Sequence, residues 1–363
     1  MGHEMKKKIL VVDDSALMRR VICDIINNDN RFEVADRATN GLEAFDLLSR
    51  KSYDAVVLDV NMPKMNGLQL LQELRKYKIS AKIMMASTDT KEGAQTTLDA
   101  LELGAMDFVH KPENAFDCRG DAFKLEMLRI LEAISNSNAP VIESREQQVQ
   151  SNERIQKVVE LVQKQPVKRH GSKLVAIASS TGGPKALQSV IPKLPQNLDA
   201  PVLIVQHMPK GFTATLAERL NGMSSIAVKE AAEGDVLLPG NVYLAMGGLH
   251  MNVQKNANGS YSIHYSDEPS REGVKPCANY MYESLVNSHY DEIVCVVMTG
   301  MGADGTVGIR NLEEAKKVHV IAQNQDTCVV YGMPKSVVNA GLSDVVVPLE
   351  EIAQEIILNV GVK

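Results

Sequence analysis

Three side chains in the second half of the chain could together perform acyl transfer: Ser180, His207 and Asp304. Each follows an apolar run of the length of a buried strand, and two glycines and a proline come after Ser180 and Thr181. Acyl transfer requires a nucleophile, a general base and an acid that orients the base. The chain order and the lack of a G-x-S-x-G elbow separate this set from the α/β-hydrolases. Singly, each residue also fits a structural role: a helix cap, a packed histidine or a turn.

A second set of candidates lies in the first third of the chain, where Asp13, Asp14, Asp59 and Lys111 follow predicted strands. The carboxyl ends of parallel strands share one edge of a sheet, so these groups can converge. Clustered carboxylates repel one another unless a cation joins them, and Mg²⁺ prefers such oxygen ligands. The set predicts an aspartyl-phosphate site with Asp59 as nucleophile and Lys111 neutralising phosphoryl charge. Taken singly, such acids commonly cap helices.

A dinucleotide-binding loop is the competing interpretation of Gly300–Gly305. This G-x-G-x-x-G segment follows a predicted strand, and Asp326 lies at about the interval expected of a ribose-binding acid. We disfavour it because Asp304 would bring a carboxylate up to the pyrophosphate, and because the motif comes late in its domain. A nicotinamide enzyme would also leave Ser180 and His207 without a role.

The elements that must position these residues alternate between short apolar runs and helical patterns, which is typical of βαβ units and parallel sheets. We therefore predict an α/β protein with two doubly wound domains. The first set of predicted strands is Ile9–Val12, Glu33–Ala38, Ala55–Asp59, Lys82–Ala86 and Asp107–His110. The second set is Leu174–Ala178, Val202–Gln206, Val242–Ala245, Ile293–Met298, Val318–Ala322 and Val345–Val347, with a β-hairpin of Met251–Gln254 and Ser260–His264 inserted.

A polar segment divides the chain, whose 363 residues exceed the usual size of one domain. Over residues 136–171 the composition shifts to Asn, Ser, Gln, Glu and Lys, which is typical of a linker. One helix is predicted within it, over Asn152–Gln163. We expect domains at residues 1–135 and 172–363.

Composition excludes several classes of protein. The net charge is −6, and no dense basic cluster follows Lys6–Lys8, so we expect no nucleic-acid partner. No apolar run approaches the roughly 20 residues that span a bilayer, and no signal-peptide region begins the chain, so we expect a cytoplasmic protein that is not inserted in a membrane. An odd number of cysteines without C-x-x-C spacing favours reduced thiols over disulfides or zinc. They are Cys23, Cys118, Cys277, Cys295 and Cys328.

Three segments of the first domain carry a family pattern: Val11–Ser15, Val57–Gly67 and Asp107–Pro112. They resemble the receiver domains of two-component response regulators. The resemblance implies a flavodoxin-like fold, Mg²⁺ as the cofactor of phosphorylation and a chemotaxis histidine kinase as phosphodonor. It also implies Asp59 as phosphoacceptor, Asp13, Asp14, Asp59 and the Asn61 carbonyl around Mg²⁺, Lys111 on the phosphate, and Ser87 and Phe108 as switch residues.

Five segments of the second domain match another family in order: Ser180–Pro184, Val205–Thr213, Gly247–Met251, Thr299–Gly305 and Tyr331–Lys335. They resemble the catalytic domain of chemotaxis protein-glutamate methylesterases. The resemblance implies a Rossmann-like domain that hydrolyses glutamyl methyl esters on the cytoplasmic helices of methyl-accepting chemoreceptors, often with deamidation of glutamine, and without a cofactor for ester hydrolysis. It assigns Ser180 as nucleophile, His207 as general base, Asp304 as orienting acid, Thr181 beside the nucleophile and Met301 at the oxyanion site.

The chain departs from the usual pattern of this family at three places. Ala178 and Ser179 stand where the family usually has Gly-Ala, and Met246 stands where it has proline. Val274–Asn279 replaces His-Arg-Pro-Ser-Val-Asp. The last difference removes a histidine and an acid, so we expect it to affect substrate positioning and the level of activity.

Regulation is expected from the presence of a phosphate switch and an esterase in one chain. We expect the unphosphorylated receiver to inhibit the enzyme by packing over the Ser180 cleft, and phosphorylation at Asp59 to shift it away. The alternative is a non-catalytic signalling or receptor-binding protein that retains the fold.

Overall fold

The computed structural model describes residues 5–88, 91–112, 120–137, 155–162 and 171–363. The chain divides into two compact units, residues 1–142 and 143–363. Much of the expected linker, residues 136–171, lies outside the described residues, so the expected domain limits stay a prediction. Residues 155–162 are helical, within the range where a linker helix is expected.

The first unit contains a five-stranded parallel sheet in the order β2-β1-β3-β4-β5. Its strands are β1 (Lys7–Val12), β2 (Phe32–Ala38), β3 (Ala55–Asp59), β4 (Ile83–Thr88) and β5 (Asp107–Lys111). Apolar side chains fill β1 and β3 because helices cover both faces of a parallel sheet. The chain reverses its direction of winding at β1 and β3, so their carboxyl ends flank the point where such folds bind ligands.

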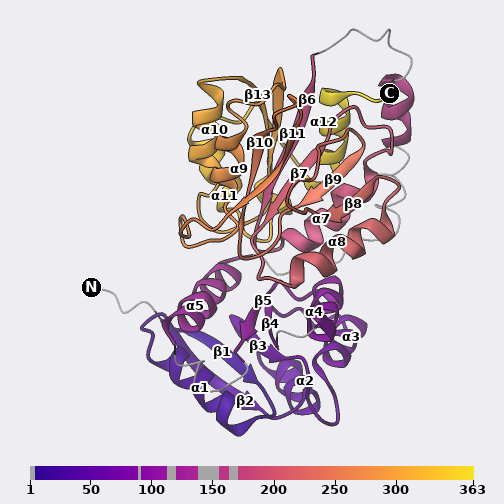
Figure 1. The fold of residues 1–363 in the computed structure, drawn as a ribbon. Helices are drawn as coiled ribbons and strands as arrows, with labels where there is room; N and C mark the ends of the chain where they lie inside the picture. Colours follow the sequence, from indigo (N-terminus) through magenta and orange to yellow (C-terminus); the bar gives the residue numbers. More distant parts are fainter. Residues whose placement is uncertain (1–4, 89–90, 113–119, 138–154, 163–170) are drawn as a thin grey trace. The chain divides into compact units, whose positions relative to one another are not determined.

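Short polar side chains cap three of the helices in the first unit. The helices of this unit are α1 (Ala16–Asn27), α2 (Gly41–Arg50), α3 (Gly67–Lys76), α4 (Lys91–Leu103) and α5 (Asp121–Asn136). Ser15 and Asn40 accept hydrogen bonds from the first turns of α1 and α2, and Asn66 forms a capping box with Gln69 at the start of α3. Figure 1 shows α1 and α5 on one face of the sheet and α2, α3 and α4 on the other.

The second unit contains a seven-stranded parallel sheet in the order β14-β13-β12-β6-β7-β9-β8. Its strands are β6 (Lys173–Ser179), β7 (Val202–Gln206), β8 (Ala227–Glu230), β9 (Asn241–Leu244), β12 (Glu292–Val297), β13 (Lys317–Gln323) and β14 (Val345–Val347). β6 lies between β12 and β7. Near the carboxyl ends of these strands, Ala178 of β6 pairs with Val297 of β12, and Ser179 of β6 pairs with Gln206 of β7. The residues that follow these three strands therefore meet at one edge.

Helices cover both faces of this sheet as well. They are α7 (Gly183–Val190), α8 (Phe212–Met223), α9 (Ala278–Ser284), α10 (Thr306–Glu313), α11 (Met333–Asn339) and α12 (Leu349–Val360), with 3₁₀ turns at Ile191–Lys193 and Gln325–Thr327. Figure 1 shows α9, α10 and α11 on one face and α7, α8 and α12 on the other. The α/β class with two parallel-sheet units is therefore confirmed.

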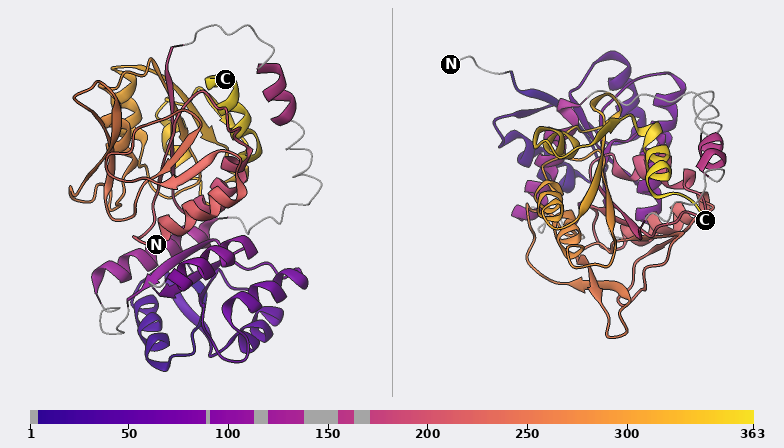
Figure 2. Two further views of the ribbon diagram at one scale, coloured as in Figure 1. Left: turned by 45° about the vertical axis from the view of Figure 1, so that its right-hand side comes forward. Right: turned by 90° about the horizontal axis from the view of Figure 1, so that it is seen from above.

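The expected hairpin is formed by β10 (His250–Lys255) and β11 (Tyr261–Ser266), which pair antiparallel. Met251, Val253 and Ile263 are buried in the core that also contains residues of β6 and β12. The hairpin projects from the second unit in the right-hand view of Figure 2, where it is drawn in orange. Its first residue, His250, is fully buried.

One strand, β8, was not expected from the sequence. Of its four residues only Val228 is buried, and in the described part of the chain the strand pairs with β9 alone, at the edge of the sheet. A strand at an edge needs few apolar residues, so its pattern is too short to distinguish it from a loop. All other strands lie within two residues of the expected limits.

Two expectations from composition concern the described residues. In the described part of the chain, no helix combines the length and the apolar character needed to cross a bilayer. Cys23, Cys277, Cys295 and Cys328 are free thiols. Cys118 lies outside the described residues.

Candidate functional site

Ser180 lies immediately after β6 and exposes only 3% of its surface. Its N–H donates to the Thr299 carbonyl at 3.0 Å, and its own carbonyl accepts from the Gly183 N–H at 2.7 Å. Gly182, with a φ of 77°, is the N-cap of α7. The capping interpretation of Ser180 is therefore wrong, and the hydroxyl is not committed to the helix.

Gly300 brings the loop after β12 against the nucleophile candidate. A Cβ atom added at Gly300 would lie 2.8 Å from Ser180 Cβ and 2.3 Å from Met333 Sδ. Such distances are shorter than carbon and sulfur atoms tolerate, so only glycine permits this approach. Gly300, the first glycine of Gly300–Gly305, therefore packs against Ser180 and Met333. A dinucleotide would need free space at this glycine, so this packing argues against the dinucleotide interpretation.

Gln206, the last residue of β7, joins the loops that carry Ser180 and His207. Its Oε1 accepts from Ser179 Oγ at 2.7 Å. Its Nε2 donates to the carbonyls of Ser180 at 3.0 Å and His207 at 3.1 Å. Sequence analysis did not single out Gln206, because a polar residue at a strand end has no signal that reveals its partners.

His207 and Asp304 form a buried pair across 97 residues of sequence. His207 Nε2 lies 2.7 Å from Asp304 Oδ2, and their side chains expose 6% and 2% of their surface. Nδ1 of His207 is buried and, within the described residues, has no hydrogen-bond partner. The imidazole is thus oriented by the acid through one nitrogen, and the other is available as a base.

Asp304 is held by three further donors from one short segment. Oδ1 accepts from Cys277 Sγ at 3.0 Å and from the Asn279 N–H at 2.9 Å, and Oδ2 accepts from the Ala278 N–H at 2.6 Å. Burial raises the pKa of this carboxyl, but the hydrogen bonds from His207, Cys277 and Ala278 outweigh it and hold the pKa below its usual value. Asp304 is therefore a carboxylate at neutral pH.

The segment Val274–Asn279, which differs from the usual family pattern, therefore contacts Asp304. Val274 is mostly buried, and Asn279 is fully buried. Sequence analysis associated this segment with substrate positioning and missed its contacts with Asp304. Since 25 to 27 residues separate these donors from their acceptor, no local periodicity could have revealed them.

Thr181, assigned beside the nucleophile, and Met301, assigned to the oxyanion site, belong to the two loops that meet at Ser180. Thr181 follows it directly and is buried, and its carbonyl accepts from Thr299 Oγ1 at 2.9 Å. Met301 follows Gly300 and is half-buried. Within the described part of the chain, the N–H groups of Thr181 and Met301 have no hydrogen-bond partner. Free N–H groups next to a nucleophile can stabilise a developing oxyanion.

The acidic candidates of the first unit also converge. One carboxylate oxygen from each of Asp13, Asp14 and Asp59 lies within 4.8 Å of the others. Lys111 Nζ lies 2.6 Å from Asp59 Oδ1 and 3.2 Å from Asp13 Oδ2. Three carboxylates with one ammonium leave two negative charges, which a divalent cation would balance, and the donors are the oxygens that Mg²⁺ prefers. The donor set therefore fits Mg²⁺.

Burial and charge act against each other in this cluster. Burial raises the pKa of Asp13 and of Asp59, and the neighbouring Lys111 offsets this only in part. Burial lowers the pKa of Lys111, but Asp59 and Asp13 outweigh it, so the pKa of the ammonium is raised. Lys111 therefore stays charged beside the carboxylate where a phosphoryl group would be attached.

The remaining candidates of the first unit are on β4, on β5 and in the loop after β3. Ser87, on β4, is buried, and its Oγ donates to the Gly93 carbonyl at 3.3 Å. Phe108, on β5, is buried. Asn61 is exposed in the loop after β3.

Comparisons with known proteins match both units. Residues 175–356 match the family model described as CheB methylesterase, and residues 9–119 match the response regulator receiver domain. Protein-glutamate methylesterase/protein-glutamine glutaminase 1 of Syntrophomonas wolfei is 41% identical over 357 residues, covering 97% of this chain and 99% of the relative. The Bacillus subtilis protein-glutamate methylesterase/protein-glutamine glutaminase is 41% identical over 354 residues, covering 96% of this chain and 97% of the relative.

A solved structure resembles the second unit. The crystal structure of the Thermotoga maritima CheB methylesterase catalytic domain is 39% identical in sequence, with a TM-score of 0.51. It covers 53% of this chain and 100% of its own.

Proposed function

Because the chain belongs to the CheB methylesterase family and carries a response regulator receiver domain, we propose that it hydrolyses glutamyl methyl esters on chemoreceptors with Ser180, His207 and Asp304. The observation that carries this proposal is the buried His207–Asp304 pair at 2.7 Å, at the sheet edge that also bears Ser180. Among the described residues, Nδ1 of His207 has no hydrogen-bond partner. That arrangement supplies a nucleophile, a base and an orienting acid.

The reaction follows from these roles. Ser180 Oγ attacks the ester carbonyl carbon, and His207 Nδ1 takes the hydroxyl proton. The N–H groups of Thr181 and Met301 donate to the oxyanion that forms. The C–O bond to the methoxy group then breaks, and His207 returns the proton to the departing oxygen as methanol leaves. A water molecule hydrolyses the acyl-serine by the same steps. With glutamine as substrate the leaving group is ammonia, so one site serves deamidation too.

The receiver supplies regulation. Asp59 takes a phosphoryl group from the phosphohistidine of a chemotaxis histidine kinase, and Lys111 neutralises charge on the phosphoryl oxygens. Asp13, Asp14, Asp59 and the Asn61 carbonyl would hold Mg²⁺, which supplies charge neutralisation during phosphoryl transfer. Ser87 and Phe108 take the switch roles. Substrate glutamates on cytoplasmic receptor helices make the cytoplasm the site of action.

The test is methanol release from a chemoreceptor cytoplasmic fragment whose glutamates carry methyl esters. We expect turnover by the whole chain and a loss of about 10⁴-fold or more in Ser180→Ala, as for other serine hydrolases that lose the nucleophile. Ser189→Ala, in α7, removes a hydroxyl that donates to the Lys185 carbonyl within its own helix, and it should retain activity. Receptor binding without methanol release would favour the non-catalytic alternative, and NADH binding would favour the nicotinamide alternative.

A further inference from the structure

A buried thiol lies beside the carboxylate that orients His207. Cys277 exposes none of its surface, and its Sγ lies 3.0 Å from Asp304 Oδ1. Burial, followed by the nearby negative charge of Asp304, raises the pKa of the thiol. Cys277 therefore stays protonated and donates a hydrogen bond to the carboxylate. A thiol is a weak donor to neutral acceptors, but a charged acceptor strengthens such bonds.

The donors to Asp304 are distributed evenly over its two oxygens. Oδ1 accepts from Cys277 and from the Asn279 N–H, and Oδ2 accepts from His207 and from the Ala278 N–H. The two N–H groups belong to the first turn of α9, where backbone donors have no partner within the helix. Among the described residues, Cys277 is the only side chain that donates to Oδ1, and it shares this oxygen with the Asn279 N–H. Its thiol therefore contributes to the orientation of that oxygen and to the charge it retains.

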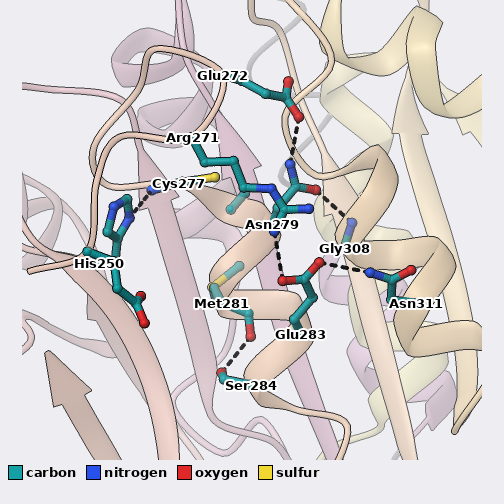
Figure 3. Close-up of polar contacts among 12 residues, drawn as sticks. His250, Arg271, Glu272, Cys277, Asn279, Met281, Glu283, Ser284, Gly308 and Asn311 are labelled. Atoms are coloured by element: carbon teal, nitrogen blue, oxygen red, sulfur yellow. Dashed lines mark hydrogen bonds and ion pairs between the residues drawn. The ribbon is translucent and has the colours of Figure 1, made fainter. Parts of the chain in front are cut away.

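Cys277 is itself fixed by His250. The Cys277 N–H donates to His250 Nδ1 at 3.2 Å, and His250 Nε2 lies 3.3 Å from the Pro269 carbonyl. Since Nδ1 accepts, the ring proton resides on Nε2 and is donated to Pro269. Burial lowers the pKa of His250, which keeps the ring neutral. Figure 3 shows the His250 ring directed at Cys277, with Asn279, two residues further along the chain, nearby.

We propose that Cys277 is a positioning residue for ester hydrolysis, whose thiol orients the Asp304 carboxylate and limits its basicity toward His207. This inference rests on the proposed function, because Cys277 acts only through Asp304 and His207. Without the thiol, Oδ1 loses a donor, and the carboxylate turns more freely and holds the His207 proton more strongly. A base that is protonated at higher pH is inactive over a wider range.

The experiment compares three variants of the whole chain, with methanol release from the methylated chemoreceptor fragment measured across pH. Cys277→Ala removes the hydrogen-bond donor, whereas Cys277→Ser replaces the S–H donor with an O–H donor at the same position. Cys295→Ala removes a thiol that is equally buried, on β12, without a hydrogen bond to the triad. Thermal unfolding of each variant measures loss of packing separately.

We expect Cys277→Ala to lower kcat about tenfold with KM unchanged, as for removal of a hydrogen bond to a charged group. The acid limb of its kcat/KM profile should move to higher pH. Cys277→Ser should restore both to within about twofold, and Cys295→Ala should match the parent chain.

Three results would overturn the inference while the parent chain remains active. The first is a Cys277→Ala variant with unchanged kcat and an unchanged acid limb. The second is a Cys277→Ser variant as impaired as the alanine variant. The third is a fall in kcat that follows the unfolding temperature without any change in the pH profile. The second and third results would indicate packing alone. Inactivity of the parent chain would contradict the proposed function instead.

Discussion

At the scale of single residues, the triad candidates depend on neighbours that take no part in the chemistry. Gln206 is the clearest case, because one amide fixes the backbones of both Ser180 and His207. An amide accepts through oxygen and donates through nitrogen, so it can bind the Ser179 hydroxyl and two carbonyls at once. A carboxylate of the same shape has no hydrogen to donate to those carbonyls.

Gln206→Glu should therefore lower kcat for methanol release by about 10- to 100-fold, because two carbonyls would lose a donor and face a buried negative charge. The matched control is Gln254→Glu, at an exposed position of β10, which should leave kcat unchanged. The two variants differ from the parent by the same atoms. Equal kcat values for Gln206→Glu and the control would show that Gln206 does not position the site.

At the scale of elements, α9 and α10 pack closely through Asn279. Its Oδ1 accepts from the N–H groups of Gly305 and Gly308 at 3.1 and 2.6 Å, and its Nδ2 donates to Glu272 Oε1 at 2.8 Å. A Cβ atom added at Gly308 would lie 2.7 Å from Asn279 Cα, so glycine is required where the helices approach. Figure 3 shows Asn279 between Glu272 and Gly308. The asparagine thus replaces the usual family acid in a position where an acid would face Glu272.

Asn279→Asp should destabilise the second unit by roughly 1–3 kcal/mol, since a carboxylate would replace the Nδ2 donor opposite Glu272. Glu272→Gln in the same chain should recover much of that loss, because an amide can donate to the new carboxylate. Urea unfolding of the four members of this double-mutant cycle measures both effects. Asn279→Asp with parental stability, or no recovery from Glu272→Gln, would contradict this account.

The elements also show what a sequence pattern can and cannot reveal. The buried strands β6, β7 and β12 were expected nearly to the residue, because strands covered on both faces are continuous apolar runs. The edge strand β8 was missed, since burial of Val228 alone produces no such run. A strand can be located from the sequence when most of its residues are buried, because it then forms a continuous apolar run. A strand with one buried residue gives no such run.

At the scale of the whole molecule, the protein combines two units that each place polar residues at the carboxyl edge of a parallel sheet. In the proposed function, phosphorylation of Asp59 would add negative charge in the first unit, and ester hydrolysis would take place in the second. A phosphate switch can control another site only if the two states of the switch differ in how they affect it.

If the unphosphorylated receiver inhibits the esterase, removal of residues 1–170 should raise methanol release above that of the unphosphorylated chain. Acetyl phosphate with Mg²⁺ should raise the activity of the whole chain, and Asp59→Asn should abolish that response while leaving the basal rate. Initial rates on the same methylated receptor fragment check all three. Activity that stays the same or falls after truncation would rule out inhibition by the receiver.

Sequence by itself determined the α/β class, the parallel strands and the polar residues at their carboxyl ends, because alternation of apolar and helical patterns is a local property of the chain. It also predicted that Ser180, His207 and Asp304 lie at one edge of a sheet, since the carboxyl ends of neighbouring parallel strands share that edge. Only the tertiary structure decided which nitrogen of His207 meets Asp304 and that Cys277 and its neighbours hold that carboxylate. Those contacts join loops distant in sequence, and their partners follow from packing, which no local pattern encodes.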